Sequence, residues 1–240
     1  MKHKSSLFAL ILFIHTLIAG QVTVPFQVGE ILNYDSNFNL IKAGTARLHV
    51  SALELIDGVP VYHIIFTVKT NKILDRIYKV RDRVETWIDA NGLFTRKFSK
   101  KVREGQYRHN FSAIINYQDS VVTTGEDSFR INDELRDPYS LFYYLRTIPL
   151  NVGDRFTYVT FDNNQFINIH LIVHRKEKIS VKAGQFDCLV IKPFRKGRSL
   201  FKQQGDMTIW LSDDHQRLPV KIVSKTKFGS MTLKLRNLGD

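Results

Sequence analysis

The sequence predicts a mainly β protein built on an antiparallel, strongly curved sheet or open β-barrel, with one short aromatic helix packed against it. Apolar residues recur at every second position in several stretches, which is the period of a strand with one buried face. One stretch, 137–147, has apolar residues at helical spacing instead. Turn-forming Asn, Asp and Gly residues separate the stretches, so we expect neighbouring strands to pair as meanders.

The clearest alternations fix the positions of several strands. Apolar and polar residues alternate from 46 to 51, and the Asp57–Gly58 turn leads into a second alternation over 59–70. The same period recurs over 107–115 and over 167–173. Strands of this kind cover a core with one face and show water the other.

The helix is predicted from Asp137 to about Thr147. Asp137 can accept hydrogen bonds as N-cap, Pro138 suits the first helical position, and Pro149 ends the run. The rings at 142–144 surround most of the helix circumference, more than one buried face can absorb. The helix is therefore either a core plug or one wall of an apolar groove. The residues assigned to ligand binding in such a groove are Leu141, Phe142, Tyr144, Leu145, Trp87 and Trp210.

The first residues predict the cellular compartment. Two lysines precede an apolar run, and the small residues Ala19 and Gly20 follow it. This order is typical of a secretory signal peptide with its cleavage site. A retained anchor is the alternative, but the run is shorter than the roughly 20 apolar residues that span a bilayer. We therefore predict a signal peptide at 1–20 and a single β-rich exported domain at 21–240.

The net charge indicates which binding partners to expect, and the cysteine content indicates whether a disulfide can form. The formal net charge is +12, with basic residues dispersed along the chain. In an exported protein this balance favours an anionic membrane surface or an acidic glycan over nucleic acid, or a solvated face with no partner. Cys188 is the only cysteine and lies in an apolar run, so we predict a buried thiol and no internal disulfide.

The motifs of familiar enzyme classes are missing. The sequence has no HExxH zinc motif, no GxSxG nucleophile elbow and no phosphate-binding loop, so no catalytic residue, metal or cofactor is predicted. Two carboxylate pairs, Asp82 with Glu85 and Asp213 with Asp214, are the candidates for acid–base catalysis on an envelope polymer. Turn formation and cross-strand charge pairing explain the same residues without catalysis.

Two parts of the chain resemble each other. A strand ending in Trp, an acidic turn and a returning basic strand occur at 87–97 and again at 210–221. The tripeptide Lys-Ala-Gly occurs at 42–44 and again at 182–184. Common hairpin chemistry explains both echoes, and the alternative is a sheet built from two related halves.

Several motifs follow one another in a fixed order along nearly the whole mature chain. They are Phe26, Gly29 and Glu30; Ala43–Gly44–Thr45; Tyr78 to Asp82; Ser140 to Arg146 with Pro149–Leu150 and Gly153–Asp154; and Trp210 through Pro219–Val220–Lys221. This set resembles the exported bacterial domain-of-unknown-function family numbered 3108. The resemblance implies a protein of the bacterial cell envelope and supplies no reaction.

The ending from Trp210 to Lys221 also resembles the last hairpins of periplasmic lipoprotein carriers, whose open β-barrel wraps an apolar cavity around a helix. We therefore expect a protein of the periplasm or outer envelope of a bacterium. The favoured function is a non-catalytic binding module for an apolar or lipid-like ligand, such as an acyl chain. The alternatives are an enzyme acting on an envelope polymer with a carboxylate pair, and a structural scaffold without a ligand.

Overall fold

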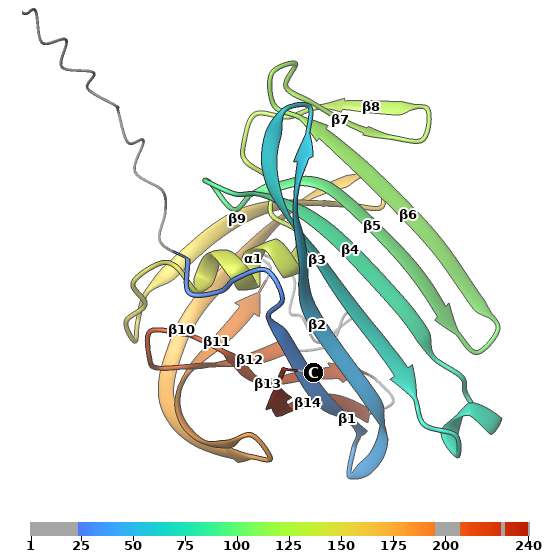
Figure 1. Ribbon diagram of the computed structural model, residues 1–240, viewed down its shortest axis with the longest axis vertical. Helices are drawn as coiled ribbons and strands as arrows, with labels where there is room; N and C mark the ends of the chain where they lie inside the picture. Colours follow the sequence, from blue (N-terminus) through green and yellow to red (C-terminus); the bar gives the residue numbers. More distant parts are fainter. Residues whose placement is uncertain (1–23, 195–206, 227–228, 240) are drawn as a thin grey trace, which may run out of the picture.

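The computed structural model describes residues 24–194, 207–226 and 229–239, and the predicted signal peptide lies outside them. The fold is mainly β, as predicted: one 14-stranded sheet has the order β8-β7-β6-β5-β4-β3-β2-β1-β14-β13-β12-β11-β10-β9. Figure 1 shows that the sheet is strongly curved and that helix α1 lies within its concave side.

Every strand pairing in the sheet is antiparallel, which agrees with the predicted meanders. The first half comprises β1 (Ile31–Phe38), β2 (Ile41–Ile56), β3 (Val59–Thr70), the 3-10 helix η1 (Leu74–Arg76), β4 (Arg81–Asp89), β5 (Thr95–Glu104), β6 (Tyr107–Asn116), β7 (Val121–Thr124) and β8 (Asp127–Arg130). The second comprises α1 (Pro138–Leu145), β9 (Arg155–Asp162), β10 (Gln165–Val181), β11 (Gly184–Phe194), β12 (Met207–Ser212), β13 (Pro219–Thr226) and β14 (Gly229–Leu238).

The two ends of the described chain meet in the middle of the sheet, because β1 pairs with both β2 and β14. The free edges are β8 and β9, which α1 connects. These edges approach each other: Leu135 forms an isolated parallel bridge with Val159, and Phe161 of β9 packs in one cluster with Ala113 and Val122. The curved sheet is therefore barrel-like, and among the described residues no hydrogen-bonded ladder joins β8 to β9.

The hairpin turns have the backbone that their sequences predict. Asp57 and Gly58 have φ of 50° and 79°, and Asn163 and Asn164 have φ of 48° and 60°. Asn, Asp and Gly tolerate this left-handed region, and two such residues in succession match the right-handed twist of the flanking strands.

The two similar segments at 87–97 and 210–221 have matching geometry. Lys97 lies opposite Trp87 and Lys221 opposite Trp210, and in each pair the ammonium is 4.4 Å from the ring centroid. A β-bulge follows the tryptophan directly in both strands. These features favour two related halves, which stays a prediction.

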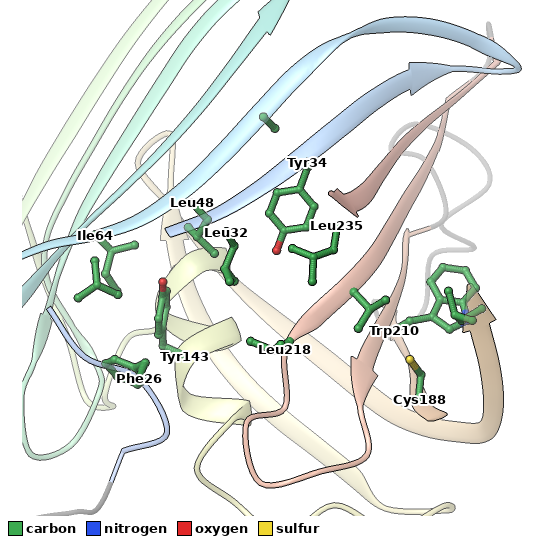
Figure 2. Close-up of a cluster of buried hydrophobic side chains, with 14 of the residues drawn as sticks. Phe26, Leu32, Tyr34, Leu48, Ile64, Tyr143, Cys188, Trp210, Leu218 and Leu235 are labelled. Atoms are coloured by element: carbon green, nitrogen blue, oxygen red, sulfur yellow. The ribbon is translucent and has the colours of Figure 1, made fainter. Parts of the chain in front are cut away.

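Helix α1 starts where the sequence predicts and ends two residues earlier than the predicted Thr147. Its excess of rings is explained by burial on two sides. Leu141, Phe142 and Leu145 pack with β10, β11 and β12. Tyr143 packs with Phe26, residues of β1 to β4 and Trp210 of β12 in another cluster, and Figure 2 shows Tyr143 beside Phe26. A helix held between two parts of one curved sheet can bury more of its circumference than a helix lying on a flat sheet.

Candidate functional site

An ion pair fixes the C-terminal end of α1. The guanidinium of Arg146 donates to both carboxylate oxygens of Glu30 at 2.6 and 2.8 Å, and its side chain is 1% exposed. The same group donates to the carbonyl oxygens of Pro25 and Gln216 and lies 5.4 Å from the ring centroid of Phe26. Arg146 therefore ties the helix to the first described segment of the chain and to the turn between β12 and β13.

The buried carboxylate of Asp137 fixes the N-terminal end of α1. Asp137 accepts hydrogen bonds from the backbone N–H groups of Tyr139 and Ser140 at 2.8 and 3.3 Å. Its second oxygen accepts from the hydroxyls of Thr86 at 2.6 Å and Thr95 at 2.7 Å. Burial raises the pKa of Asp137, and these hydrogen bonds oppose that increase. Both ends of α1 are thus anchored, so the helix has a defined position on the concave side.

Helix α1 covers only part of the apolar face beneath it. Around the buried Leu141 and Leu145, other apolar side chains of the same cluster remain half-buried. We call them the helix-side surface: Tyr139, Tyr144, Ile148, Phe156, Tyr158, Ile169, Met207 and Ile222. Its aromatic rings contact one another, with centroids 5.6 Å apart for Tyr144 and Tyr158.

A cation lies at the margin of the helix-side surface. The guanidinium carbon of Arg136 is 4.1 Å from the ring centroid of Tyr144 and 5.7 Å from that of Tyr158. Arg136 is 7% exposed and donates to the carbonyl of Gly92 and to Glu134. Its Nε–H is buried without an acceptor among the described residues. An apolar surface with a cation at its edge suits an amphipathic ligand with an acidic group.

The predicted ligand-binding residues fall into two groups. Leu141, Phe142 and Leu145 lie together beneath the helix, and Tyr144 borders them. Trp87 lies apart from these residues. Thr86 bonds to the helix cap, and side chains alternate along a strand, so Trp87 lies on the other face of β4.

Trp87 and Trp210 have different surroundings. The ring of Trp87 stacks on His63 at 4.3 Å, and its Nε1 donates to Glu54. Trp210 is buried, but its neighbours Ile209 and Leu211 are the residues of β12 that pack with the helix cluster. Trp210 itself belongs to the other buried cluster, which contains Tyr143 of α1.

The carboxylates considered for catalysis are engaged in ion pairs and local hydrogen bonds. Asp82 and Glu85 are three residues apart on β4 and therefore lie on opposite faces, and Glu85 is bound by Arg83 and His63. Asp214 accepts backbone hydrogen bonds within its own turn. Within 24–194, 207–226 and 229–239, no group of three or more His, Cys, Asp and Glu side chains is placed to bind a metal ion.

Cys188 is a buried free thiol, as predicted. Burial raises its pKa to about 12, and the nearby carboxylates of Asp187 and Asp214 act in the same direction. A thiol with so high a pKa is a poor nucleophile at neutral pH, so Cys188 has the character of a core residue.

A second charged centre surrounds Asp35 on β1. Lys182 lies 2.7 Å from its carboxylate, Lys42 lies 3.5 Å away and Arg236 lies 4.0 Å away. Lys42 and Lys182 are the first residues of the two Lys-Ala-Gly tripeptides. The repeated tripeptide therefore places two lysines beside the carboxylate of Asp35. Burial alone would raise the pKa of Asp35, but the hydrogen bond and charge of Lys182 and the charge of Lys42 outweigh it, and the pKa is lowered.

The lowered pKa of Asp35 predicts a dependence of stability on pH. A carboxyl whose pKa is depressed by folding stabilises the folded state fully above its unfolded pKa of about 3.9 and loses that contribution as the pH falls through the folded value. The difference in unfolding free energy between wild type and Asp35→Asn should therefore stay constant near neutral pH and shrink below about pH 4. Urea titrations across this range measure it, and an unchanged difference would contradict the assignment.

Sequence reasoning missed Arg146, Glu30 and Arg136 as site residues. A usable signal was present for Arg146, because an arginine directly after the apolar positions of a buried helix needs a partner. Nothing in the sequence identified Glu30 as that partner across more than a hundred residues. No helix in the described part of the chain is long and apolar enough to cross a membrane.

Comparison with known proteins agrees with this fold. A β-barrel-like protein of domain of unknown function DUF1849 from Brucella abortus superposes with a TM-score of 0.61 at 14% identity, over 88% of this chain and 97% of that one. At that identity the likeness shows the fold alone. A candidate lipoprotein from Parabacteroides distasonis gives a TM-score of 0.36 at 10% identity, over 91% of this chain and 100% of that one, which is too low to support an argument.

A search of the curated proteins found no match. A family model does match, over residues 33–236, and its description is "Protein of unknown function (DUF3108)". The matched range runs from β1 to β14 and includes both halves of the sheet and the helix between them. The chain therefore belongs to the DUF3108 family, as the ordered motifs predict.

Proposed function

We propose that this protein is exported to the bacterial envelope and acts there as a non-catalytic binding module for an apolar, lipid-like ligand with an acyl chain. The observation that carries the proposal is the helix-side surface, which α1 leaves half-covered on the concave side of the sheet. A soluble protein seldom leaves neighbouring aromatic and aliphatic side chains exposed without a binding role.

The chemistry of the surface matches an amphipathic molecule. Phe156, Ile169 and Ile222 offer apolar contacts for a hydrocarbon chain. Arg136 at the margin offers its positive charge to an acidic head group. The guanidinium of Arg136 stacks on Tyr144, so the aromatic ring holds the donor beside the apolar surface.

The acyl-binding proposal predicts a specific effect of Tyr144. A fluorescent fatty acid should bind the mature protein at micromolar concentrations, and Tyr144→Ala should weaken that binding by about tenfold because a large ring contact is lost. Fluorescence titration measures the dissociation constants. Urea unfolding should show that Tyr144→Ala remains folded, since this residue is only half-buried.

Tyr107→Ala is the matched control. Tyr107 is 58% exposed and starts β6, far from α1 in Figure 1, so its loss should leave probe binding unchanged. Native mass spectrometry of protein purified from its own envelope should show co-purifying acyl species. A wild-type protein that binds no acyl probe at micromolar concentrations would favour the scaffold alternative.

A further inference from the structure

We infer a second binding site, for a ligand that carries at least two phosphate groups, in a pair of basic clefts that meet at Lys42. The clefts have volumes of about 400 and 440 Å³. The first is lined by Asp35, Asn37, Lys42, Ser180, Val181, Lys182, Lys234 and Leu235. The second is lined by Lys42, Gly44, Thr45, Lys69, Thr70, Asn71, Lys72, Asp75 and Arg81. Because Lys42 lines both, the two clefts adjoin.

Asp35 and Lys234 of the first cleft point away from the buried cluster around Tyr143, and Leu235 of that cluster borders the same cleft. Tyr34 and Leu235 are cross-strand partners and lie in that cluster. Asp35 and Lys234 are the next pair in register, and side chains alternate, so these two point to the opposite face. No residue of the helix-side surface lines either cleft, so the two are separate sites.

The lining carries a large excess of positive charge. Together the two clefts contain Lys42, Lys69, Lys72, Arg81, Lys182 and Lys234 against Asp35 and Asp75, which gives 6 − 2 = +4. Both acids are already paired, Asp75 with Arg81 and Asp35 with Lys182. Among the described residues, Lys69, Lys72 and Lys234 have no ion-pair partner. An anionic ligand would neutralise this excess.

The cations form a row across the strands. Lys221, Lys234, Asp35, Thr45, Lys69 and Arg81 are successive cross-strand partners on β13, β14, β1, β2, β3 and β4. Adjacent strands are about 4.8 Å apart, so Lys234 and Lys69, three strands apart, are separated by roughly 14 Å. Burial, and then the charge of Lys234, lowers the pKa of Lys221, which agrees with uncompensated positive charge along the row.

The excess of positive charge in the clefts, and its spread along the row of strands, identify the chemical class of the ligand. A phosphate monoester carries about two negative charges at neutral pH, so two such groups balance the excess, whereas four carboxylates would be needed. Most of the cations are lysines, which bind phosphate as point charges and do not require one fixed planar orientation. A ligand with two phosphates spaced along the row fits this arrangement better than a single compact anion.

Isothermal titration calorimetry with inorganic tripolyphosphate tests the site. The wild-type protein should bind tripolyphosphate more tightly than inorganic phosphate at equal ionic strength, and the affinity should fall as salt is added. Lys42→Gln should weaken tripolyphosphate binding about tenfold, because one charge-assisted contact shared by both clefts is lost. Lys42 has a side chain that is 59% exposed, so this variant should fold normally.

Arg130→Gln is the matched control, since it removes one exposed positive charge from β8 at the edge of the sheet. It should leave the affinity within about twofold, the range expected for a distant exposed charge. Equal weakening by both variants, or no binding by the wild type, would overturn the inference.

Vesicles of neutral lipid with or without cardiolipin distinguish the sources of the phosphate groups; the two phosphates of cardiolipin are diesters with about one negative charge each, so they would balance half of the excess. Displacement of tripolyphosphate only by cardiolipin vesicles would identify a lipid head group, and tripolyphosphate binding without displacement would identify a soluble ligand. Both outcomes support the site. The acyl-probe titration is independent, because the two sites share no lining residue.

Discussion

Replacing Arg146 by methionine should lower the free energy of unfolding by about 3–5 kcal/mol, the cost of removing one partner of a buried ion pair. Methionine keeps much of the volume of arginine but leaves the carboxylate of Glu30 without its two hydrogen bonds. The carbonyl oxygens of Pro25 and Gln216 lose their donor at the same time. Urea unfolding followed by circular dichroism measures the change.

The double variant Glu30→Gln with Arg146→Met separates the ion pair from simple packing. If the penalty arises from the isolated carboxylate, removing the charge of Glu30 should recover part of the stability lost in Arg146→Met. Arg130→Met at an exposed position of β8 should change stability by less than about 0.5 kcal/mol. A double variant as unstable as the sum of its single variants would show that the two residues act independently.

The sequence was sufficient to predict the fold class because strand periodicity and turn chemistry are local properties. The alternation over 59–70 and the Asp57–Gly58 turn require no knowledge of distant residues, and β3 begins and ends at the predicted positions. The N-cap at Asp137 is local in the same sense. The pairing of β1 with β14 was not predictable in this way, because it joins strands from the two ends of the domain.

Contacts between distant residues also limited the prediction of the sites. Periodicity identified α1 and its apolar residues, but the helix packs between two parts of the sheet, so counting rings on its circumference did not show how many would remain exposed. Both tryptophans were predicted to line the groove together with the helix. Strand register places Trp87 on the face opposite Thr86 and the helix cap, whereas Trp210 packs in the buried cluster of Tyr143, and register depends on the whole sheet.

The basic clefts show why dispersed charge in a sequence is a poor guide to surface charge. Lys42, Lys69, Lys182 and Lys234 belong to four different strands or turns and are far apart along the chain. Antiparallel pairing brings them to one face, where Lys42 and Lys182 contact the same carboxylate. A charge run would have been visible in the sequence, whereas a row across strands becomes visible only when the register is known.

Replacing Asp137 by alanine should lower the free energy of unfolding by about 3 kcal/mol or more, because the loss of an N-cap adds to the loss of buried hydrogen-bond acceptors. The backbone N–H groups of Tyr139 and Ser140 and the hydroxyls of Thr86 and Thr95 all lose the acceptor they now share. Since α1 connects β8 to β9, a frayed first turn should also loosen the helix-side surface.

Asp137→Asn is the informative control for this prediction. Asparagine can cap the helix with its carbonyl oxygen, and the hydroxyls of Thr86 and Thr95 can rotate to accept from its amide, so most of the network should survive. Removing a carboxylate whose pKa burial has raised also removes the cost of keeping a charge there. Asp137→Asn should therefore lose less than half as much stability as Asp137→Ala in the same urea titration. Equal losses would show that the charge itself, and not the geometry of its acceptors, holds α1 in place.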